Sequence, residues 1–292
     1  MDLIGKRVAL VGSKGMLAFA FKEALPDSIE LLELDLPEFD LTDRRQVVDT
    51  LVGFGADVVI NCAAYTNVDG CESEEELAVR VNGEGVANLA EATRQCGGVL
   101  AHVSTDYVFA GDKQEPYVEA DMTGPVSAYG RSKLLGEESL RSSGLDAYFI
   151  VRTSWLYGPG GKNFVETVRR LATEKQEMRI VADQIGTPTY TVDLAQAIFN
   201  LLQTEAYGLY HFSNDGQCSW FDFSSEIVNQ LRALGGKLAV EKVLPIRTED
   251  YPLPATRPAY SVFSKEKYIS VTGADVPGWR ESLTCYLKRQ GQ

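Results

Sequence analysis

The chain has 292 residues, 45% of them hydrophobic, with 28 lysine and arginine residues against 41 aspartate and glutamate residues. This length is sufficient for one large domain or two modest ones with a buried core. The formal net charge of −13 argues against a nucleic acid or an anionic membrane as partner, because both are bound mainly through basic patches.

Cysteine and histidine usage excludes other kinds of site. The five cysteines are scattered without a C-x-x-C pair, which argues against a disulfide framework or a zinc site. Two histidines are too few for a histidine-rich metal centre. The first residues, MDLIGKRVALVG, lack the pattern of a signal peptide, and no apolar run approaches the roughly 18 residues of a membrane span. We therefore expect a cytoplasmic protein.

Short apolar runs alternate with helical periods through the first half of the chain. The predicted strands cover residues 7–12, 29–35, 57–64, 98–105 and 147–154. The predicted helices cover residues 16–25, 43–55, 81–97 and 127–144. This alternation predicts an α/β fold of the Rossmann type, in which a doubly wound parallel sheet is covered by helices on both faces.

After residue 152 the alternation becomes less regular. Helices are predicted within residues 159–175 and 191–203 and near 278–289, and prolines cluster between residues 245 and 258. We expect residues 1–151 to form the dinucleotide-binding domain, completed by segments near 185–212. Residues 152–292 are then mostly a smaller C-terminal substrate-binding lobe over the carboxyl ends of the strands, where open α/β folds bind ligands.

The segment VALVGSKGMLA carries a glycine-rich turn. Gly12 and Gly15 lie between the first predicted strand and the first helix, and Ala18 follows one turn later. Small residues at this spacing let the backbone approach a pyrophosphate, whose charge lies at the helix N-terminus. A glycine pair also occurs in ordinary strand–helix turns. Its place at the start of an alternating chain favours a dinucleotide.

Two charged residues bear on which dinucleotide is bound. Asp35 ends the second predicted strand, where a carboxylate can bind the adenosine ribose and repel a 2′-phosphate. Lys14, inside the glycine turn, would instead attract that phosphate. A turn aspartate and a solvated lysine are the ordinary interpretations. NADH and NADPH both stay open.

A tyrosine and a lysine four residues apart, Tyr129 and Lys133, share one face of a predicted helix. A nearby ammonium favours the phenolate and lowers the pKa of a tyrosine from its usual value near ~10. Thr105, at the end of the fourth predicted strand, would donate a hydrogen bond to a carbonyl oxygen that gains negative charge, and Tyr129 would deliver the proton. Alone, the Tyr-x-x-x-Lys pair is more typical of a solvated helix than of a catalytic site. Together with the threonine and the glycine turn, it favours a proton-transfer site.

These motifs resemble the extended short-chain dehydrogenase/reductase family, with its YxxxK helix and N-terminal glycine turn. Within it, the chain is most similar to reductases that form dTDP-L-rhamnose. The matching segments cover nearly the whole chain and include NCAAYTNVD, STDYVFAG, AYGRSKLLGE, VRTSWLYGPGGKNFV and TRPAYSVFSKEK. The resemblance implies that NADPH or NADH reduces the 4-keto group of a dTDP-linked 6-deoxy sugar.

The resemblance also implies roles for individual residues. Its catalytic positions are Thr105, Tyr129 and Lys133. Its cofactor-binding positions are Gly12, Lys14, Gly15, Met16, Leu17, Asp35, Asp40, Leu41, Ala63, Ala64, Tyr65, Tyr129 and Lys133. Thr105, Asp106, Trp155 and Arg257 fall at the substrate. A core tryptophan and a surface ion pair are the alternatives for Trp155 and Arg257.

Some members of the family hold a carboxylate-bound magnesium ion at a dimer contact. Met16 and its neighbours in the glycine turn offer no carboxylate, so we expect no metal site, and a homodimer stays open. Two other functions also stay open for this fold: a nucleotide-sugar epimerase that retains NAD, and a non-catalytic, nucleotide-binding regulatory subunit. An intact Thr105, Tyr129 and Lys133 argues against the subunit.

Overall fold

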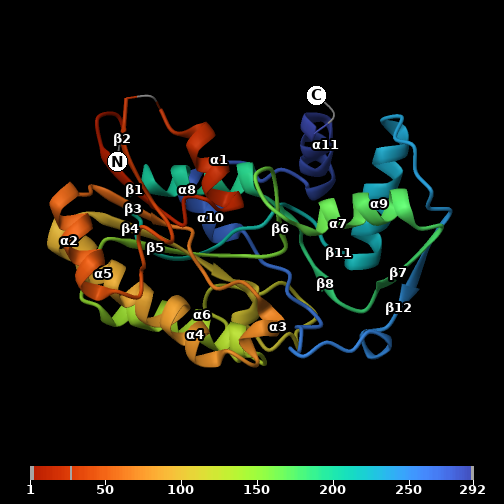
Figure 1. Cartoon of the computed structure of the whole chain (residues 1–292), viewed down its shortest axis with the longest axis horizontal. Coiled ribbons are helices and arrows are strands. Elements are labelled where there is room, and N and C mark those ends of the chain that lie inside the picture. Colours follow the sequence, from red (N-terminus) through yellow and green to blue (C-terminus); the bar gives the residue numbers. More distant parts are fainter. Residues whose placement is uncertain (1–2, 27, 291–292) are drawn as a thin grey trace.

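The computed structural model describes residues 3–26 and 28–290. Its centre is a six-stranded parallel sheet with the strand order β10-β5-β4-β3-β1-β2 (Figure 1). The strands are β1 (Arg7–Val11), β2 (Glu30–Leu34), β3 (Val58–Asn61), β4 (Val99–Thr105), β5 (Tyr148–Thr153) and β10 (Gly208–His211). The strand order reverses next to β1, and ligands of open α/β sheets bind at such a reversal.

Alternate residues of each strand face opposite helical layers. Val8 and Leu10 of β1 belong to the core that includes α1 (Met16–Ala24) and α8 (Thr191–Leu202). Ala9 and Val11 belong to the opposite core, with α2 (Arg44–Phe54) and α5 (Gly85–Cys96). Both faces are buried, as the apolar runs predict for a parallel sheet.

Other helices surround this layer. Those on the side of α5 are α3 (Val68–Cys71), α4 (Glu75–Val79), the π-helix η1 (Arg80–Glu84) and α6 (Ala128–Ser142) (Figure 1). On the side of α1 lies α10 (Glu266–Thr272), which packs against α8. The 3₁₀-helix η2 (Asp106–Val108) follows β4 directly.

The second half of the chain forms a lobe beside the sheet (Figure 1). Its helices α7 (Phe164–Glu174), α9 (Trp220–Ala233) and α11 (Trp279–Gln290) share an apolar core. Its short strand pairs are β7 (Glu177–Val181) with β12 (Lys242–Ile246), β6 (Leu156–Tyr157) with β9 (Thr189–Tyr190), and β8 (Ile185–Gly186) with β11 (Cys218–Ser219). A 3₁₀-helix, η3 (Thr248–Asp250), follows β12.

The chain passes more than once between lobe and sheet. After β6, α7 and β7 in the lobe, it returns to add α8 and β10 to the sheet, and then builds α9. The pattern of apolar residues did not lead us to expect α9 or α10. The division at residues 151 and 152 stays a prediction.

Candidate active site

A cavity of about 670 Å³ opens at the carboxyl ends of the central strands, where the lobe meets the sheet. Its walls come from the turn after β1, the end of β2, the segment after β3, the end of β4, α6 and the segment after β5. Trp220, the first residue of α9, adds a wall from the lobe. The fold thus brings segments from both halves of the chain around one space.

The glycine turn forms one wall of this cavity. Gly12 has a φ of +77°, and a Cβ atom on it would lie 2.6 Å from the backbone nitrogen of Ala63. Gly15 is the N-cap of α1, no side chain caps that helix, and Gly15, Met16 and Leu17 line the cavity. Free N–H groups at a helix N-terminus attract anions. The turn therefore fits the pyrophosphate of a dinucleotide.

Asp35 and Lys14 lie together at the rim of the cavity. The Asp35 carboxylate accepts hydrogen bonds of 2.8 Å from the backbone nitrogens of Lys14 and Leu36. The Lys14 ammonium lies 3.2 Å from the Glu38 carboxylate. A 2′-phosphate here would be attracted by Lys14 and repelled by the carboxylates of Asp35 and Glu38, so these groups act in opposite directions on the choice between NADPH and NADH.

Of the other five predicted cofactor-binding residues, three line the cavity and two do not. Leu41, Ala63 and Ala64 line the cavity, whereas Asp40 and Tyr65 are not among the described residues of its wall. The Asp40 carboxylate accepts hydrogen bonds from Thr42, and the Tyr65 hydroxyl contacts Glu74. All five assignments stay predictions.

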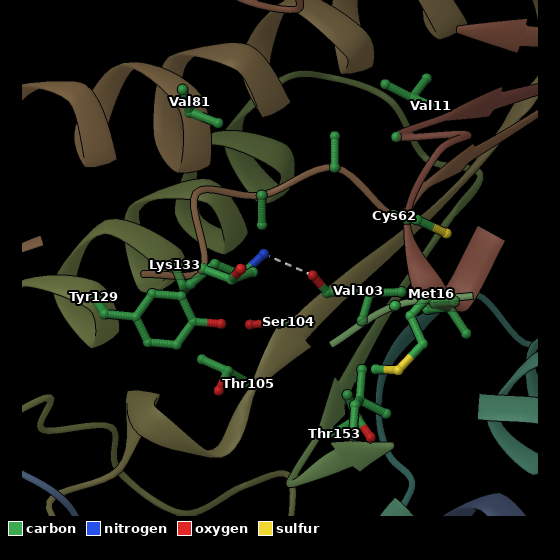
Figure 2. A pocket seen from close by; sticks show the side chains of 18 of the residues that line it. Val11, Met16, Cys62, Val81, Val103, Ser104, Thr105, Tyr129, Lys133 and Thr153 are labelled. Carbon is green, nitrogen blue, oxygen red and sulfur yellow. Dashed lines mark hydrogen bonds between the residues drawn. The ribbon is translucent and has the colours of Figure 1, made fainter. Parts of the chain in front are cut away.

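Thr105, Tyr129 and Lys133 meet on one side of the cavity (Figure 2). Ser127 caps the N-terminus of α6, its Oγ accepting a 3.1 Å hydrogen bond from the backbone nitrogen of Gly130. A Cβ atom on Gly130 would lie 2.2 Å from the carbonyl oxygen of Tyr107, so α6 packs closely on η2. The side chain of Tyr129 thereby lies beside Thr105 in the cavity wall (Figure 2).

The electrostatics of this group differ from the expectation that Lys133 lowers the pKa of Tyr129. Burial of the tyrosine hydroxyl raises its pKa above the usual value instead. The Lys133 ammonium donates a 2.7 Å hydrogen bond to the carbonyl oxygen of Val103, and burial lowers its pKa to about 8 (Figure 2). Desolvation disfavours both charged forms here. Tyr129 is therefore protonated at neutral pH, as a proton donor must be.

Asp106 lies directly beside Thr105 in the cavity wall and is only 2% exposed. Its Oδ1 accepts a 3.0 Å hydrogen bond from Thr105 Oγ1, and its buried Oδ2 has no partner. Burial raises the pKa of this carboxyl to about 6. An unpaired buried acceptor at a cavity wall is suited to a ligand hydroxyl.

Trp155 and Trp220 together form another part of the cavity wall. The two indole rings stack with centroids 3.5 Å apart and planes at 8°. Trp155 has a φ of +48°, a conformation that a bulky side chain rarely adopts, and a Cβ atom on Gly186 would lie 2.6 Å from its ring. Trp155 is therefore part of the cavity wall. Trp220, 65 positions later, carried no signal in the sequence.

Arg257 lies outside the described cavity wall. Its guanidinium pairs with the Asp69 carboxylate at 2.6 and 2.8 Å, and Asp69 also accepts a hydrogen bond from the backbone of Ala255. Arg257 lies near Tyr107, whose ring packs edge-on against that of Tyr129 with the ring centroids 5.4 Å apart. Of the two interpretations offered by the sequence, an ion pair is present, and a substrate role stays a prediction.

Asn82 is a supporting residue that the sequence did not point out. It lies in η1 and is 1% exposed. Its Nδ2 donates to Ser132 Oγ at 2.9 Å and to the carbonyl oxygen of Tyr65 at 3.1 Å, and its Oδ1 accepts from the Tyr65 nitrogen at 2.8 Å. Asn82 thus joins α6 to the segment after β3. A buried asparagine in a helix is the only signal that could have revealed it.

The whole chain matches one family of known proteins. The family model described as RmlD substrate binding domain matches residues 6–291. This chain belongs to the RmlD family. Among the relatives, a dTDP-4-dehydrorhamnose reductase of Burkholderia thailandensis is 41% identical over 288 residues, which cover 95% of this chain and 96% of that protein.

Solved structures of RmlD relatives agree closely with this one. A dTDP-4-dehydrorhamnose reductase of Clostridium acetobutylicum has a TM-score of 0.92 at 39% identity, covering 98% of this chain and all of that one. The Bacillus anthracis reductase, solved in complex with NADP, has a TM-score of 0.91 at 40% identity, covering 97% and 99%. The predicted resemblance and the Rossmann-type fold are confirmed.

Residues 3–26 and 28–290 lack two further features. No helix in this part of the chain is both long enough and apolar enough to cross a membrane. The same residues contain no cluster of three or more histidine, cysteine, aspartate or glutamate side chains arranged for a metal ion.

Proposed function

We propose that this RmlD-family protein reduces the 4-keto group of a dTDP-linked 4-keto-6-deoxy sugar with NADPH or NADH and forms dTDP-L-rhamnose, a precursor for polysaccharides. The proposal is carried by one observation. Tyr129, kept protonated by burial, lies beside Thr105 in the same cavity as the uncapped N-terminus of α1. Near-complete coverage at about 40% identity to dTDP-4-dehydrorhamnose reductases supports it.

The residues divide the work of binding. The backbone of Gly12, Gly15 and Met16 would hold the pyrophosphate, and Asp35 with Lys14 would meet the adenosine ribose. The bound nicotinamide supplies a hydride to the sugar carbonyl. The stacked Trp155 would present a flat apolar face to the deoxysugar.

Three side chains then handle the charge that develops on the carbonyl oxygen. Thr105 donates a hydrogen bond to that oxygen, and Tyr129 gives up its proton to it. Loss of this proton turns Tyr129 into a buried phenolate. A buried anion is unfavourable in free energy unless a cation lies close to it. The ammonium of Lys133, one turn along α6, supplies that cation and would also hold the nicotinamide ribose.

The test is turnover of a dTDP-4-keto-6-deoxy sugar, followed by the absorbance of the reduced cofactor. We expect wild-type protein to oxidise NADPH or NADH and release it, and Tyr129→Phe to lose about 10²–10⁴-fold in kcat. Tyr251→Phe, at an exposed tyrosine, is the matched control and should be unaffected. An inactive wild type, or an equally fast Tyr129→Phe, contradicts the proposal. Cofactor retained through the cycle would instead support an epimerase.

We expect the protein to act in the cytoplasm. A homodimer stays a prediction, which light scattering tests.

A further inference from the structure

A buried ionic cluster lies directly behind the catalytic positions. We call Glu137, Arg152, Arg141 and Ser104 the Glu137 cluster. Glu137 Oε1 accepts from Ser104 Oγ at 2.6 Å and from Arg152 Nε at 2.8 Å. Glu137 Oε2 accepts from Arg152 Nη2 at 2.7 Å and from Arg141 Nη2 at 2.8 Å. Four donors saturate a carboxylate that is 0% exposed.

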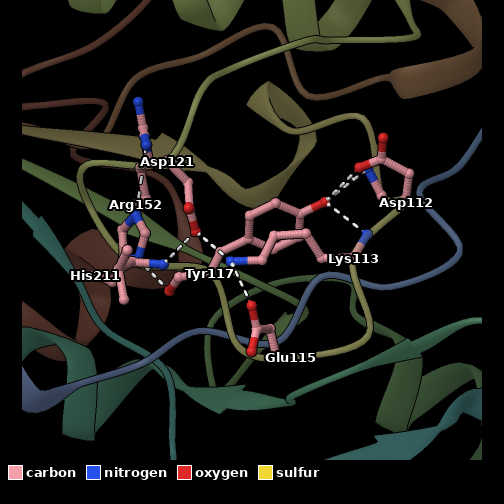
Figure 3. Close-up of polar contacts among 9 residues, drawn as sticks. Asp112, Lys113, Glu115, Tyr117, Asp121, Arg152 and His211 are labelled. Carbon is pink, nitrogen blue, oxygen red and sulfur yellow. Dashed lines mark hydrogen bonds and ion pairs between the residues drawn. The ribbon is translucent and has the colours of Figure 1, made fainter.

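Arg152 connects the Glu137 cluster through His211 to the loop between β4 and α6 (Figure 3). Arg152 Nη1 lies 3.4 Å from His211 Nε2, and His211 Nδ1 lies 3.1 Å from the carbonyl oxygen of Tyr117. Burial lowers the pKa of His211 to about 3, so the ring is neutral and accepts from Arg152. The Tyr117 hydroxyl bonds Asp112 and the backbone of Gly111. The cluster therefore connects β4, β5, β10, α6 and this loop.

Stability alone is a weak reason for such a cluster. Buried ion pairs lose much of their Coulomb energy to desolvation, and apolar residues of similar volume are often as good. The position of Glu137 offers another reason. It lies one helical turn after Lys133 on α6, about 5–6 Å away between Cβ atoms for this spacing. Its partner Ser104 directly precedes Thr105 at the end of β4.

We propose that Glu137 is a positioning residue for Thr105 and Lys133, which fixes the end of β4 through Ser104 and supplies the negative charge that keeps the Lys133 ammonium protonated inside the protein. This inference rests on the proposed function, because it assigns a role beside the reacting groups. Arg152 and Arg141 hold the carboxylate in place, and the loop contacts of His211 fix Arg152 in turn.

Of the groups that raise the pKa of Lys133, Glu137 is the one that carries a negative charge at pH 7. Burial lowers the pKa of Lys133, and the charge of Glu137 opposes that shift. Burial raises the pKa of Cys62, after β3, and of Tyr129, on α6, while it lowers that of His102, on β4. These three groups are therefore neutral at pH 7. Lys133 is cationic below its pKa, so activity should be lost as pH rises through about 8.

The experiment is the pH profile of kcat at saturating substrate and cofactor. Glu137→Gln removes the charge and keeps the shape, so the alkaline limb should move down by about one pH unit, within the range of nearby-charge effects. Glu138→Gln, an exposed glutamate on the same helix, is the matched control and should leave the limb in place. A purely structural role would lower stability and kcat without moving the limb.

A second variant guards against a Glu137→Gln protein that does not fold. Arg141 is 37% exposed in its side chain and gives Glu137 only one of its four hydrogen bonds. Arg141→Gln should fold, and with one cation fewer beside Glu137, more of its negative charge acts on Lys133. The alkaline limb of the pH profile of kcat should therefore move up by a fraction of a pH unit. Ser104→Ala should lower kcat several-fold with the limb unmoved.

The possible results distinguish failure of the proposed function from failure of the role of Glu137. A wild type without turnover overturns the proposed function. The role of Glu137 alone is overturned by a different result. In that case the wild type turns over, but the alkaline limb of the pH profile stays at the wild-type position in Arg141→Gln and in any folded Glu137→Gln protein.

Discussion

On one wall of the cavity, Thr105, Tyr129 and Lys133 come from a single strand–loop–helix unit that runs from β4 to α6. In another part of the cavity wall, Trp155 follows β5, whereas Trp220 begins α9 in the lobe. The first wall, the β4–α6 wall, holds titratable groups whose pKa values burial has shifted. The second, the tryptophan wall, is apolar and half-buried.

The difference suggests separate tasks for the two walls. Groups that move or stabilise a proton act only as charge develops, so their loss lowers kcat. An indole face contacts the substrate before and during reaction, so its loss should raise KM. Four substitutions test this division.

The largest effect is expected at Lys133 on the β4–α6 wall. Lys133→Met keeps the length of the side chain but removes the cation beside the Tyr129 phenolate, and kcat should fall about 10²–10⁴-fold with little change in the KM of the sugar nucleotide. Steady-state kinetics measure both constants. Arg131→Met, at a half-exposed cation on the same helix, is the control. A change confined to KM would contradict the proposed division of tasks between the two walls.

Gly12 tests the turn between the two walls. Gly12→Ala places a Cβ atom 2.6 Å from the backbone nitrogen of Ala63 at a positive φ, so the free energy of unfolding should fall by about 1–3 kcal/mol. Cofactor binding should weaken as well. Gly53→Ala is the matched control, because its added Cβ would meet nothing within 4 Å. Thermal unfolding with and without NADPH compares both variants with the wild type. If Gly12→Ala were as stable as the wild type, the turn would have adjusted to the added Cβ atom.

Trp220 tests the tryptophan wall. Trp220→Ala removes the ring that stacks on Trp155, so the indole that would face the sugar loses its support and KM should rise several-fold. The value of kcat should change less. Trp220→Phe should recover part of the affinity. If kcat falls instead, the stack serves the chemistry and the division between the walls fails.

The smallest effect is expected at Asp69, which pairs with Arg257 outside the cavity wall. Asp69→Asn removes a partly exposed ion pair worth about 0.2–1 kcal/mol, so stability should fall slightly and the difference should shrink at high salt. Urea unfolding at two salt concentrations measures it. A KM change larger than that of Trp220→Ala would assign substrate recognition to this ion pair.

The β4–α6 wall is the part of the site that was accessible to sequence reasoning. Thr105 ends an apolar run, and Tyr129 and Lys133 share a helical face, so local periodicity alone predicts where they point. The glycine turn was equally local. The tryptophan wall was only half predicted, because nothing in the order of residues joins Trp155 to Trp220.

The supporting residues were missed for a related reason. Asn82 and Glu137 are polar residues within helices, and periodicity does not say which elements bury them. Arg257 pairs with Asp69, the ion pair that the sequence offered as one interpretation, and its substrate role stays a prediction. Each of these partners lies on another element.

By itself, the amino-acid sequence determined the alternation of strands and helices, the place of the glycine turn and the pairing of Tyr129 with Lys133, because each depends on neighbours within a few residues. The tertiary structure alone decided that burial raises the pKa of Tyr129 and that Trp220 completes the tryptophan wall. It also placed the Glu137 carboxylate behind Thr105. Burial and contact between distant segments arise only when the lobe, the sheet and its helices pack together.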